Sequence, residues 1–268
     1  MLFAWLLPSS AHADLDLDQQ VRVIPDTHDV KPYIWQVRQE PQGYELVIGH
    51  TKSAGKPDGF LVGIKTSSGE LPERMHVFVT DEDLHVYSHV RPMRDEDGHY
   101  LFNFIPPSAG NYRFEIVFRT EKGWINLRKD ISLEKSDLKA TDTRPGEEDY
   151  DVKVNLYPKK IYADHVVTFL YQIRYKDTPL IDLEKIEEAD MQVAAWDENM
   201  KEFIYMTPQQ NLGGPDVAVS MVFRRPGKHA VFAEFKHNGI IRRVDFVVNV
   251  YAEPPLLQET LPGLGPSG

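Results

Sequence analysis

The sequence predicts an all-β protein made of two tandem antiparallel β-sandwiches. Short runs of alternating apolar and polar residues recur along the chain, and clusters of Gly, Pro, Asn and Asp separate them. Alternation with period two buries one face of a strand, and turn residues between such runs favour short antiparallel strands. A long stretch of this pattern returns in the second half of the chain. At 268 residues the chain has room for two cores.

The repeat is the strongest single indication of two units. The stretch Met75–Phe118 returns in weaker form as Met191–Phe235. At a constant offset the matched residues are Met75 with Met191, Val77 with Val193, Asp81-Glu82 with Asp197-Glu198, and Pro92 with Pro208. Both copies continue through a Pro/Gly turn, at Pro107–Gly110 and at Pro226-Gly227, into another alternating strand. Internal repetition of this kind indicates two copies of one structural unit.

The strands expected in chain order follow from the same alternation. A first sandwich is predicted over residues 32–136, a charged linker over 137–149 and a second, degenerate sandwich over 150–252. Asn238-Gly239 predicts a tight hairpin, since both residues tolerate positive φ. A connection with helical character is expected over Ile181–Ala189. The expected strands include Ile34–Val37, Tyr44–Ile48, Phe60–Ile64, Ile131–Leu133, Tyr150–Leu156, Val166–Tyr171 and Val244–Tyr251.

Both ends of the chain are predicted to lie outside the sandwiches. Residues 1–13, MLFAWLLPSSAHA, pair a short apolar run with an Ala-His-Ala sequence typical of a signal peptidase site. The run lacks a basic start, so the signal peptide is interpreted as possibly truncated. Residues 14–31 form an acidic leader, and the Pro/Gly-rich residues 253–268 a disordered tail. The mature protein is therefore expected in the periplasm or outside the cell, with no transmembrane segment.

Composition excludes several classes of function. The chain has no cysteine, which removes disulfides, thiolate catalysis and cysteine metal sites. Its net charge of -11 argues against nucleic acid as a partner, because such binding depends on neutralising phosphates with Lys and Arg. Glycine-rich phosphate loops and the Gly-x-Ser-x-Gly elbow are absent from the sequence. No enzymatic activity is therefore expected, and a hydrolase is the remote alternative.

One hairpin carries the candidate site. If Met75–Val90 turns at Asp81–Asp83, alternation sends the valines inward and three histidines outward. Pairing of Thr80 with His85 would place His76 opposite His89. Imidazoles with nearby thioethers suit copper, so the candidate metal ligands are His76, His89, His85, Met75 and Met93, with His99 close by. The alternative is an exposed polar face without metal. The acidic runs Asp81–Asp83, Asp95–Asp97 and Glu184–Asp190 are interpreted as solvated surface.

The same residues carry a resemblance to a family. Met75-His76, Asp83-Leu84, His89-Val90-Arg91-Pro92, Asp97-Gly98 and Gly110–Arg113 resemble the YtkA-like (FixH/YtkA-related) domains of bacterial envelope proteins. The resemblance implies immunoglobulin-like sandwiches, a secreted or envelope location, no general enzymatic activity and, in some members, a link to copper. His76 and His89 match the histidines of the family. Arg91 replaces the second histidine of its His-x-His-Pro element.

These observations predict a secreted, non-enzymatic binding or assembly module with a protein partner in the cell envelope. Two alternatives remain open. One is a periplasmic copper-binding protein that uses the histidine face of the first unit. The other is a structural surface or filament subunit that self-associates by pairing exposed edge strands.

Overall fold

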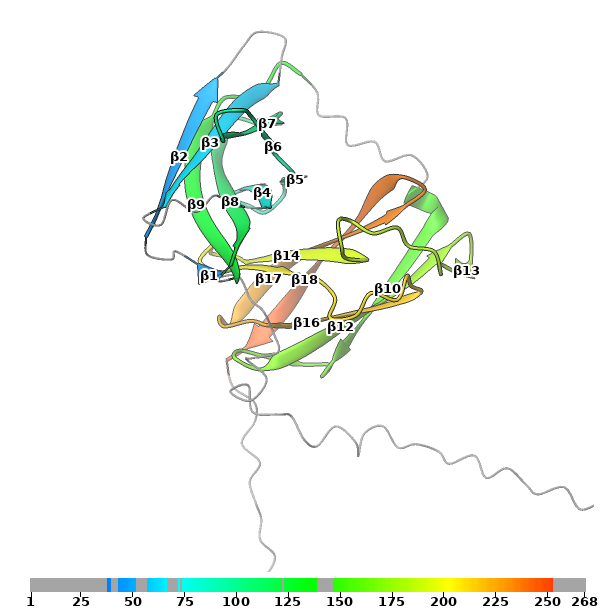
Figure 1. Cartoon of the computed structure of the whole chain (residues 1–268). Coiled ribbons are helices and arrows are strands. Elements are labelled where there is room, and N and C mark those ends of the chain that lie inside the picture. The colour runs from blue at the N-terminus through cyan, green and yellow to red at the C-terminus, as the bar shows by residue number, and fades with distance from the viewer. Residues whose placement is uncertain are drawn as a thin grey trace, which may run out of the picture.

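A computed structural model describes residues 38–39, 43–51, 57–66, 72, 74–121, 123–138 and 147–252. The predicted signal peptide 1–13, leader 14–31, strand Ile34–Val37 and tail 253–268 lie outside the described residues, as does the middle of the linker, 139–146. The described residues form two all-β units, one above the other in Figure 1. Within them, no helix is long and apolar enough to cross a membrane.

The first unit is a sandwich of two sheets, with strand orders β1-β9-β8-β4-β5 and β2-β3-β7-β6. All its strand pairs are antiparallel except β1 with β9. Its strands are β1 (Arg38–Gln39), β2 (Tyr44–Thr51), β3 (Asp58–Thr66), β4 (Met75–Asp81), β5 (Tyr87–Val90), β6 (Met93–Arg94), β7 (Tyr100–Phe104), β8 (Gly110–Thr120) and β9 (Gly123–Leu133).

The second unit repeats the plan. One sheet has the order β11-β18-β17-β14-β15, and in the other β12 pairs with β10, β13 and β16. Its elements are the 3-10 turn η1 (Glu147–Asp149), β10 (Tyr150–Tyr157), β11 (Ile161–Tyr162), β12 (Val166–Tyr175), β13 (Thr178–Pro179), β14 (Met191–Asp197), β15 (Phe203–Met206), β16 (Asp216–Val222), β17 (Gly227–His237) and β18 (Ile240–Tyr251).

The repeat seen in the sequence is a repeat of structure. Met191 begins β14 as Met75 begins β4, and Trp196 pairs with Phe203 as Thr80 pairs with Tyr87. The all-β prediction is therefore confirmed, and the offset matches strand for strand in this part of each unit. The predicted Asn238-Gly239 hairpin is also confirmed, because His237 pairs with Ile240 and both turn residues have positive φ, 52° and 74°.

Each unit has its own core between its sheets. In the first unit Val77 and Val79 are fully buried among Phe60, Phe102 and Phe114. The prediction that the valines of the β4–β5 hairpin point inward is thus confirmed for β4, and Val86 and Val90 pack against the same core. Burial of large apolar side chains of this kind supplies most of the stabilisation of a sandwich.

The prediction of helical character over Ile181–Ala189 is wrong. The connection is irregular: Glu184 bridges to Lys236, Ile186 bridges to Ala189, and Glu187 has a φ of 59°. The helix-like spacing arises because Leu183 and Ile186, three residues apart, are both buried. They anchor a loop whose backbone bonds with other segments, including Leu183 N to Gly213 O at 3.0 Å. Tertiary contacts override a local period of this length.

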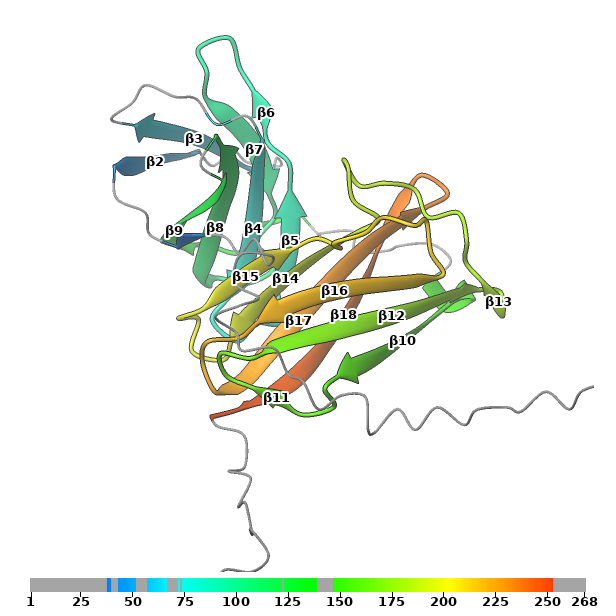
Figure 2. The same ribbon diagram turned by 60° about the horizontal axis from the view of Figure 1, so that its bottom comes forward.

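The two units pack face to face through the sheets that carry β4 and β14. Figure 1 shows β14 of the second unit below β4 and β5 of the first, and Figure 2 shows β14 and β15 next to β4 and β5. A third apolar cluster fills this junction, drawn from both units: Phe78, Val117, Ala194, Trp196, Phe203, Tyr205 and Phe232. The strands β4 and β14 are consequently buried on both faces along almost their whole length.

Candidate functional site at the junction of the units

The structure separates the five predicted metal ligands. The side chain of Met75 is buried in the core of the first unit. Met93 is 77% exposed, and His85 is exposed at the hairpin turn. His76 and His89 lie together, with His76 Nδ1 3.0 Å from His89 Nε2. Of the predicted set, these two histidines are the pair that the fold brings into contact.

The predicted pairing within the hairpin is wrong by two residues. Thr80 pairs with Tyr87 rather than His85, and Phe78 rather than His76 lies opposite His89. The turn is longer because Asp81 Oδ1 accepts hydrogen bonds from the backbone N–H groups of His85, at 2.7 Å, and Val86, at 3.0 Å. A shift of two keeps every side chain on its predicted face. His76 therefore still reaches His89, along the diagonal.

The expectation of a solvent-exposed histidine face is also wrong. The side chains of His76 and His89 are 0% exposed, because the second unit covers them. The face they share carries Phe78, Tyr87 and Val117, which pack against the second unit. Apolar and aromatic side chains on the outer face of central strands are the signal that could have revealed this contact.

The two imidazoles form the middle of a chain of polar contacts across the junction. His89 Nδ1 donates to Glu234 Oε2 on β17 at 2.5 Å. His76 Nε2 lies 3.4 Å from Glu187 Oε2 on the connection before β14. The order is therefore Glu187, His76, His89, Glu234, with both carboxylates supplied by the second unit. Buried charged groups are tolerated when they are paired in this way.

The surroundings of these polar contacts determine which of the side chains are charged. The close approach of His76, helped by the nearby guanidinium of Arg91, lowers the pKa of Glu187. Burial lowers the pKa of His89, although Glu234 acts in the opposite sense. Burial also raises the pKa of Tyr87 and of Tyr205, so both phenols stay neutral. Glu187 is ionised and His89 is a neutral imidazole at neutral pH.

Arg91 lies where its charge opposes the binding of a metal ion by His76 and His89. Its Nε lies 3.3 Å from Glu187 Oε1, and its Nη2 donates to Gln192 Oε1 at 2.7 Å. A guanidinium beside the same carboxylate that contacts His76 repels a divalent cation. The donor set therefore fits a buried ion-pair network better than the copper site that the resemblance implies.

A second group of potential metal ligands lies at the β6–β7 turn. Donor atoms of Asp95, Asp97 and His99 are all within 4.8 Å of one another, in the one such group of three found among the described residues. His99 Nδ1 lies 3.4 Å from Asp95 Oδ2, and the backbone N–H of His99 donates to Asp95 Oδ1. These bonds within the turn lower the pKa of Asp95. His99 lies here, apart from the pair at the junction.

The acidic run Glu184–Asp190 is only partly the solvated surface that the sequence predicts. Glu187 contacts His76 and Arg91, as described above, and Asp190 is 1% exposed and accepts from the backbone N–H of Gly213. Glu188 stays at the surface and pairs with Arg74 of the first unit at 2.5 Å. The run therefore contributes ion pairs to the junction and anchors a neighbouring loop.

Another buried carboxyl group lies on the same face of the first unit. Glu115 on β8 is 0% exposed and accepts from Asn126 Nδ2 at 2.6 Å. Burial raises its pKa to about 7. The alternating pattern of β8 did not indicate that Glu115 is buried, since a Glu at an outward position normally faces water.

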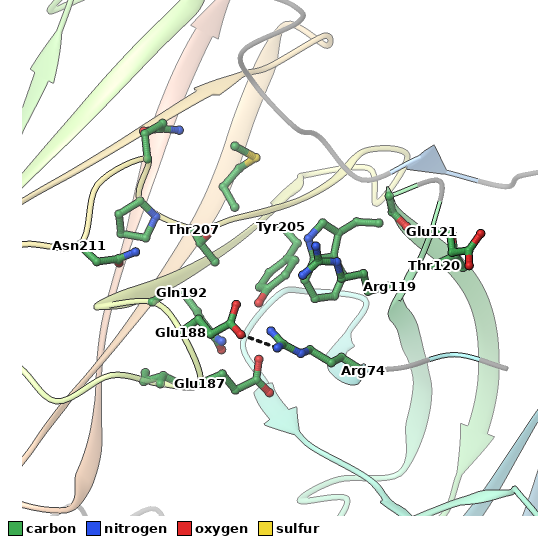
Figure 3. A pocket seen from close by; sticks show the side chains of 17 residues that line it. Arg74, Arg119, Thr120, Glu121, Glu187, Glu188, Gln192, Tyr205, Thr207 and Asn211 are labelled. Carbon is green, nitrogen blue, oxygen red and sulfur yellow. Dashed lines mark hydrogen bonds and ion pairs between the residues drawn. The ribbon is translucent and has the colours of Figure 1, made fainter.

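A cleft of about 730 Å³ opens beside this chain of polar contacts, and both units contribute to its walls. In Figure 3, Arg74, Arg119, Thr120 and Glu121 of the first unit lie across from Glu187, Glu188, Gln192, Thr207 and Asn211 of the second. Tyr205 lies between the two walls, and its ring is 5.6 Å from that of Trp124. A concave site with aromatic rings and a few amide, hydroxyl and charged groups is typical of ligand binding.

Comparisons with known proteins match the second unit and the general architecture. Residues 146–252 match a family model described as a domain of unknown function, DUF8832. No curated protein matches the chain. Similar solved structures include the FN1–FN3 domains of chicken CNTN1, with 10% identity, 80% of this chain and 68% of that chain covered, and a TM-score of 0.25.

Two further structures show similar values. A two-domain fibronectin type-III segment from chicken tenascin has 6% identity and a TM-score of 0.24. The match covers 76% of this chain and 99% of that segment. Salmonella alpha-2-macroglobulin has 13% identity, the match covers 82% of this chain and 15% of that chain, and the TM-score is 0.27. By its own sheet order, the chain is an all-β protein of immunoglobulin-like antiparallel sandwiches, and its second unit is similar to the DUF8832 family.

Proposed function

We propose that this protein is a non-enzymatic binding or assembly module of the cell envelope, and that a partner protein binds in the cleft between its two units. The secretory character of residues 1–13 supports export to the periplasm or the outside of the cell. The YtkA-like resemblance of the first unit supports the same location. The high negative charge disfavours a nucleic-acid partner.

The cleft is the observation that carries this proposal. Its walls come from both units, so its shape depends on how the units are held together. The apolar cluster and the buried polar chain at the junction hold them in one arrangement. The Arg74–Glu188 ion pair also spans the two walls. A preformed site binds its ligand at a lower entropic cost than a mobile one.

Site-specific photocrosslinking in the cells that make the protein tests the proposal. A photoreactive residue replaces the half-buried Thr207 in the cleft, and a matched variant carries it at the exposed Lys153 on β10. We expect one defined adduct from position 207 and none from position 153, in the envelope fraction. Equal adducts from both positions, or none from position 207, would contradict binding in the cleft.

Copper binding is the second candidate function: two buried imidazole nitrogens lie 3.0 Å apart, although the guanidinium of Arg91 beside Glu187 opposes a cation there. A copper titration of the purified protein decides it. Tight binding that is lost in the His76→Ala/His89→Ala double variant would favour the copper function. Binding that is equal in both proteins would remove it.

Assembly through strand edges is tested separately. Among the described strands, β2 and β10 lie at the edges of their sheets, and each has eight residues. Exposed edges offer unpaired backbone groups to another chain. Light scattering over a range of concentrations should show a monomer if the cleft alone is used, and a growing mass if the edges pair.

A further inference from the structure

A second cavity, of about 380 Å³, lies next to the cleft and is lined by three arginines. They come from three segments: Arg74 precedes β4, Arg91 follows β5 and Arg94 ends β6. Among the described residues, Glu187 is the one carboxylate in the lining, and Glu188 beside it pairs with Arg74. Three guanidinium groups against these two carboxylates leave an excess of one positive charge, in a protein whose net charge is -11. Local fields of this kind concentrate ligands of the opposite charge.

Two of the three guanidinium groups in this cavity are oriented by partners. Two of the five N–H donors of Arg91 face Glu187 and Gln192, which orients its guanidinium. Arg74 is fixed by its ion pair with Glu188. Arg94 lies over the β6–β7 turn, where a Cβ at Gly98 would come within 3.4 Å of Arg94 Nη2. Planar guanidinium groups donate in pairs to carboxylate and phosphate oxygens, which a lysine cannot do.

The rest of the lining is apolar and firmly anchored. Pro72, Pro92 and Met75 form part of the wall with Tyr100, whose hydroxyl donates to the carbonyl oxygen of Pro72. Tyr100 is 5% exposed and Met75 is 6% exposed. Apolar walls limit the water around the arginines, so their attraction for an anion is less screened than on an open surface.

The local field already favours negative charge. The pKa of Glu187 lies below its ordinary value because of His76, Arg91 and Arg74. Glu187 and Arg74 line both the cavity and the cleft, so the two spaces adjoin. A ligand with a polar body in the cleft can therefore place a charged end among the arginines.

We propose that this cavity binds an oxyanion group, a carboxylate or a phosphate, carried by the ligand that occupies the cleft. The inference rests on the proposed binding function and deepens it by naming the chemistry at one end of the ligand. Arg94 and Arg91 hold the anion, and Arg74 exchanges part of its contact with Glu188 for it.

The experiment uses two anions, inorganic phosphate and succinate, titrated into the full chain at constant ionic strength. Amide and guanidinium N–H signals are followed by NMR. We expect saturable shifts confined to Arg74, Arg91, Arg94 and their neighbours. The anion that binds more tightly identifies the source as a phosphate or a carboxylate group. Shifts that do not saturate by about 50 mM, where binding would contribute less than about 2 kcal/mol, would overturn the proposal.

The exposed position of Arg94 makes Arg94→Gln the decisive variant, since its removal leaves both cores intact. Its loss should weaken anion binding about tenfold, as expected for one charge-assisted contact. The control is Arg224→Gln, which removes the same charge from an exposed turn of the second unit. Equal binding by the two variants would contradict the proposal.

The two proposals fail separately. Saturable anion binding that Arg94→Gln weakens, without an adduct from position 207, would keep the site and remove the protein partner. An adduct from position 207 without anion binding would keep the partner and remove the anion site.

Discussion

His76 and His89 lie diagonally across the β4–β5 hairpin, with their facing ring nitrogens 3.0 Å apart, and each contacts a carboxylate of the other unit. His89→Ala leaves Glu234, whose side chain is 10% exposed, without its imidazole partner. Leaving a buried acceptor without its hydrogen-bond donor costs about 1–3 kcal/mol of unfolding free energy. Urea denaturation measures the loss.

The control is His85→Gln on the same hairpin. Because His85 is exposed at the hairpin turn, this change should stay within about 0.5 kcal/mol. A His89→Ala protein as stable as the control would show that the chain of contacts contributes nothing to holding the units together.

The hydrogens of the two imidazoles follow from their partners. A neutral His89 that donates from Nδ1 to Glu234 must accept at Nε2, so His76 donates from Nδ1. We therefore expect side-chain 15N NMR at neutral pH to show a single N–H on His89, at Nδ1, and an unprotonated Nε2. A His89 ring protonated at both nitrogens, or at Nε2 alone, would contradict this arrangement.

Glu115 should make stability fall as the pH rises. Its pKa is raised from 4.5 in the unfolded chain to about 7 in the folded protein, so the folded state holds the proton more tightly. The stabilisation is complete below pH 4.5 and is lost between pH 4.5 and 7, by about 3 kcal/mol. Glu115→Gln stays neutral and removes this loss.

The measurement is the free energy of unfolding of both proteins from pH 5 to 8. His89 acts in the opposite direction, since its lowered pKa costs stability as the pH falls below about 6.5. The difference between the two proteins cancels that contribution. A difference that does not grow between pH 5 and pH 7 would show that Glu115 titrates as an ordinary carboxyl group.

Trp196 connects the units through aromatic packing. It is 0% exposed and lies 6.4 Å, ring centre to ring centre, from Phe78 of the first unit. Trp196→Ala should cost about 3–5 kcal/mol. Because the loss falls on the junction, calorimetry should show the single transition splitting in two. Leu212→Ala, at a side chain that is 73% exposed, is the matched control and should leave one transition.

Gly214 shapes the loop at one end of the cleft. A Cβ there would meet Leu180 O at 2.3 Å, and its φ is +89°. Gly214→Ala should therefore cost clearly more than the roughly 1 kcal/mol expected from positive φ alone. The comparison is Gly239→Ala, where φ is +74° and no atom lies within 4 Å. Equal losses of thermal stability would show that the loop moves to accept the methyl group.

The fold could be predicted because its signals are local. Alternation placed Val77 and Val79 in the core, and Asn238-Gly239 marked a hairpin by backbone conformation alone. The turn was predicted at Asp81–Asp83, but its length was missed because it depends on a carboxylate that accepts from two backbone N–H groups. Nothing in the spacing of the hairpin encodes that contact.

The site could be predicted only in part, because it is made by contacts between distant segments. The pattern singled out His76 and His89, which the structure brings together. Their partners Glu187 and Glu234 come from more than a hundred residues later in the chain. An isolated strand cannot show that another sheet will cover its outer face. Phe78 was one visible sign, since a phenylalanine facing water is unfavourable.

The correspondence between the facing sheets has a consequence for ancestry. Since β4 and β14 hold the same place in the repeat and both lie at the junction, each unit buries the same surface. Contact of one surface with its own copy is the geometry of a symmetric homodimer. Fusion of two such protomers by gene duplication would give this chain, and the fused halves could then diverge. Gln192 now occupies the place that corresponds to His76, and Tyr205 that of His89.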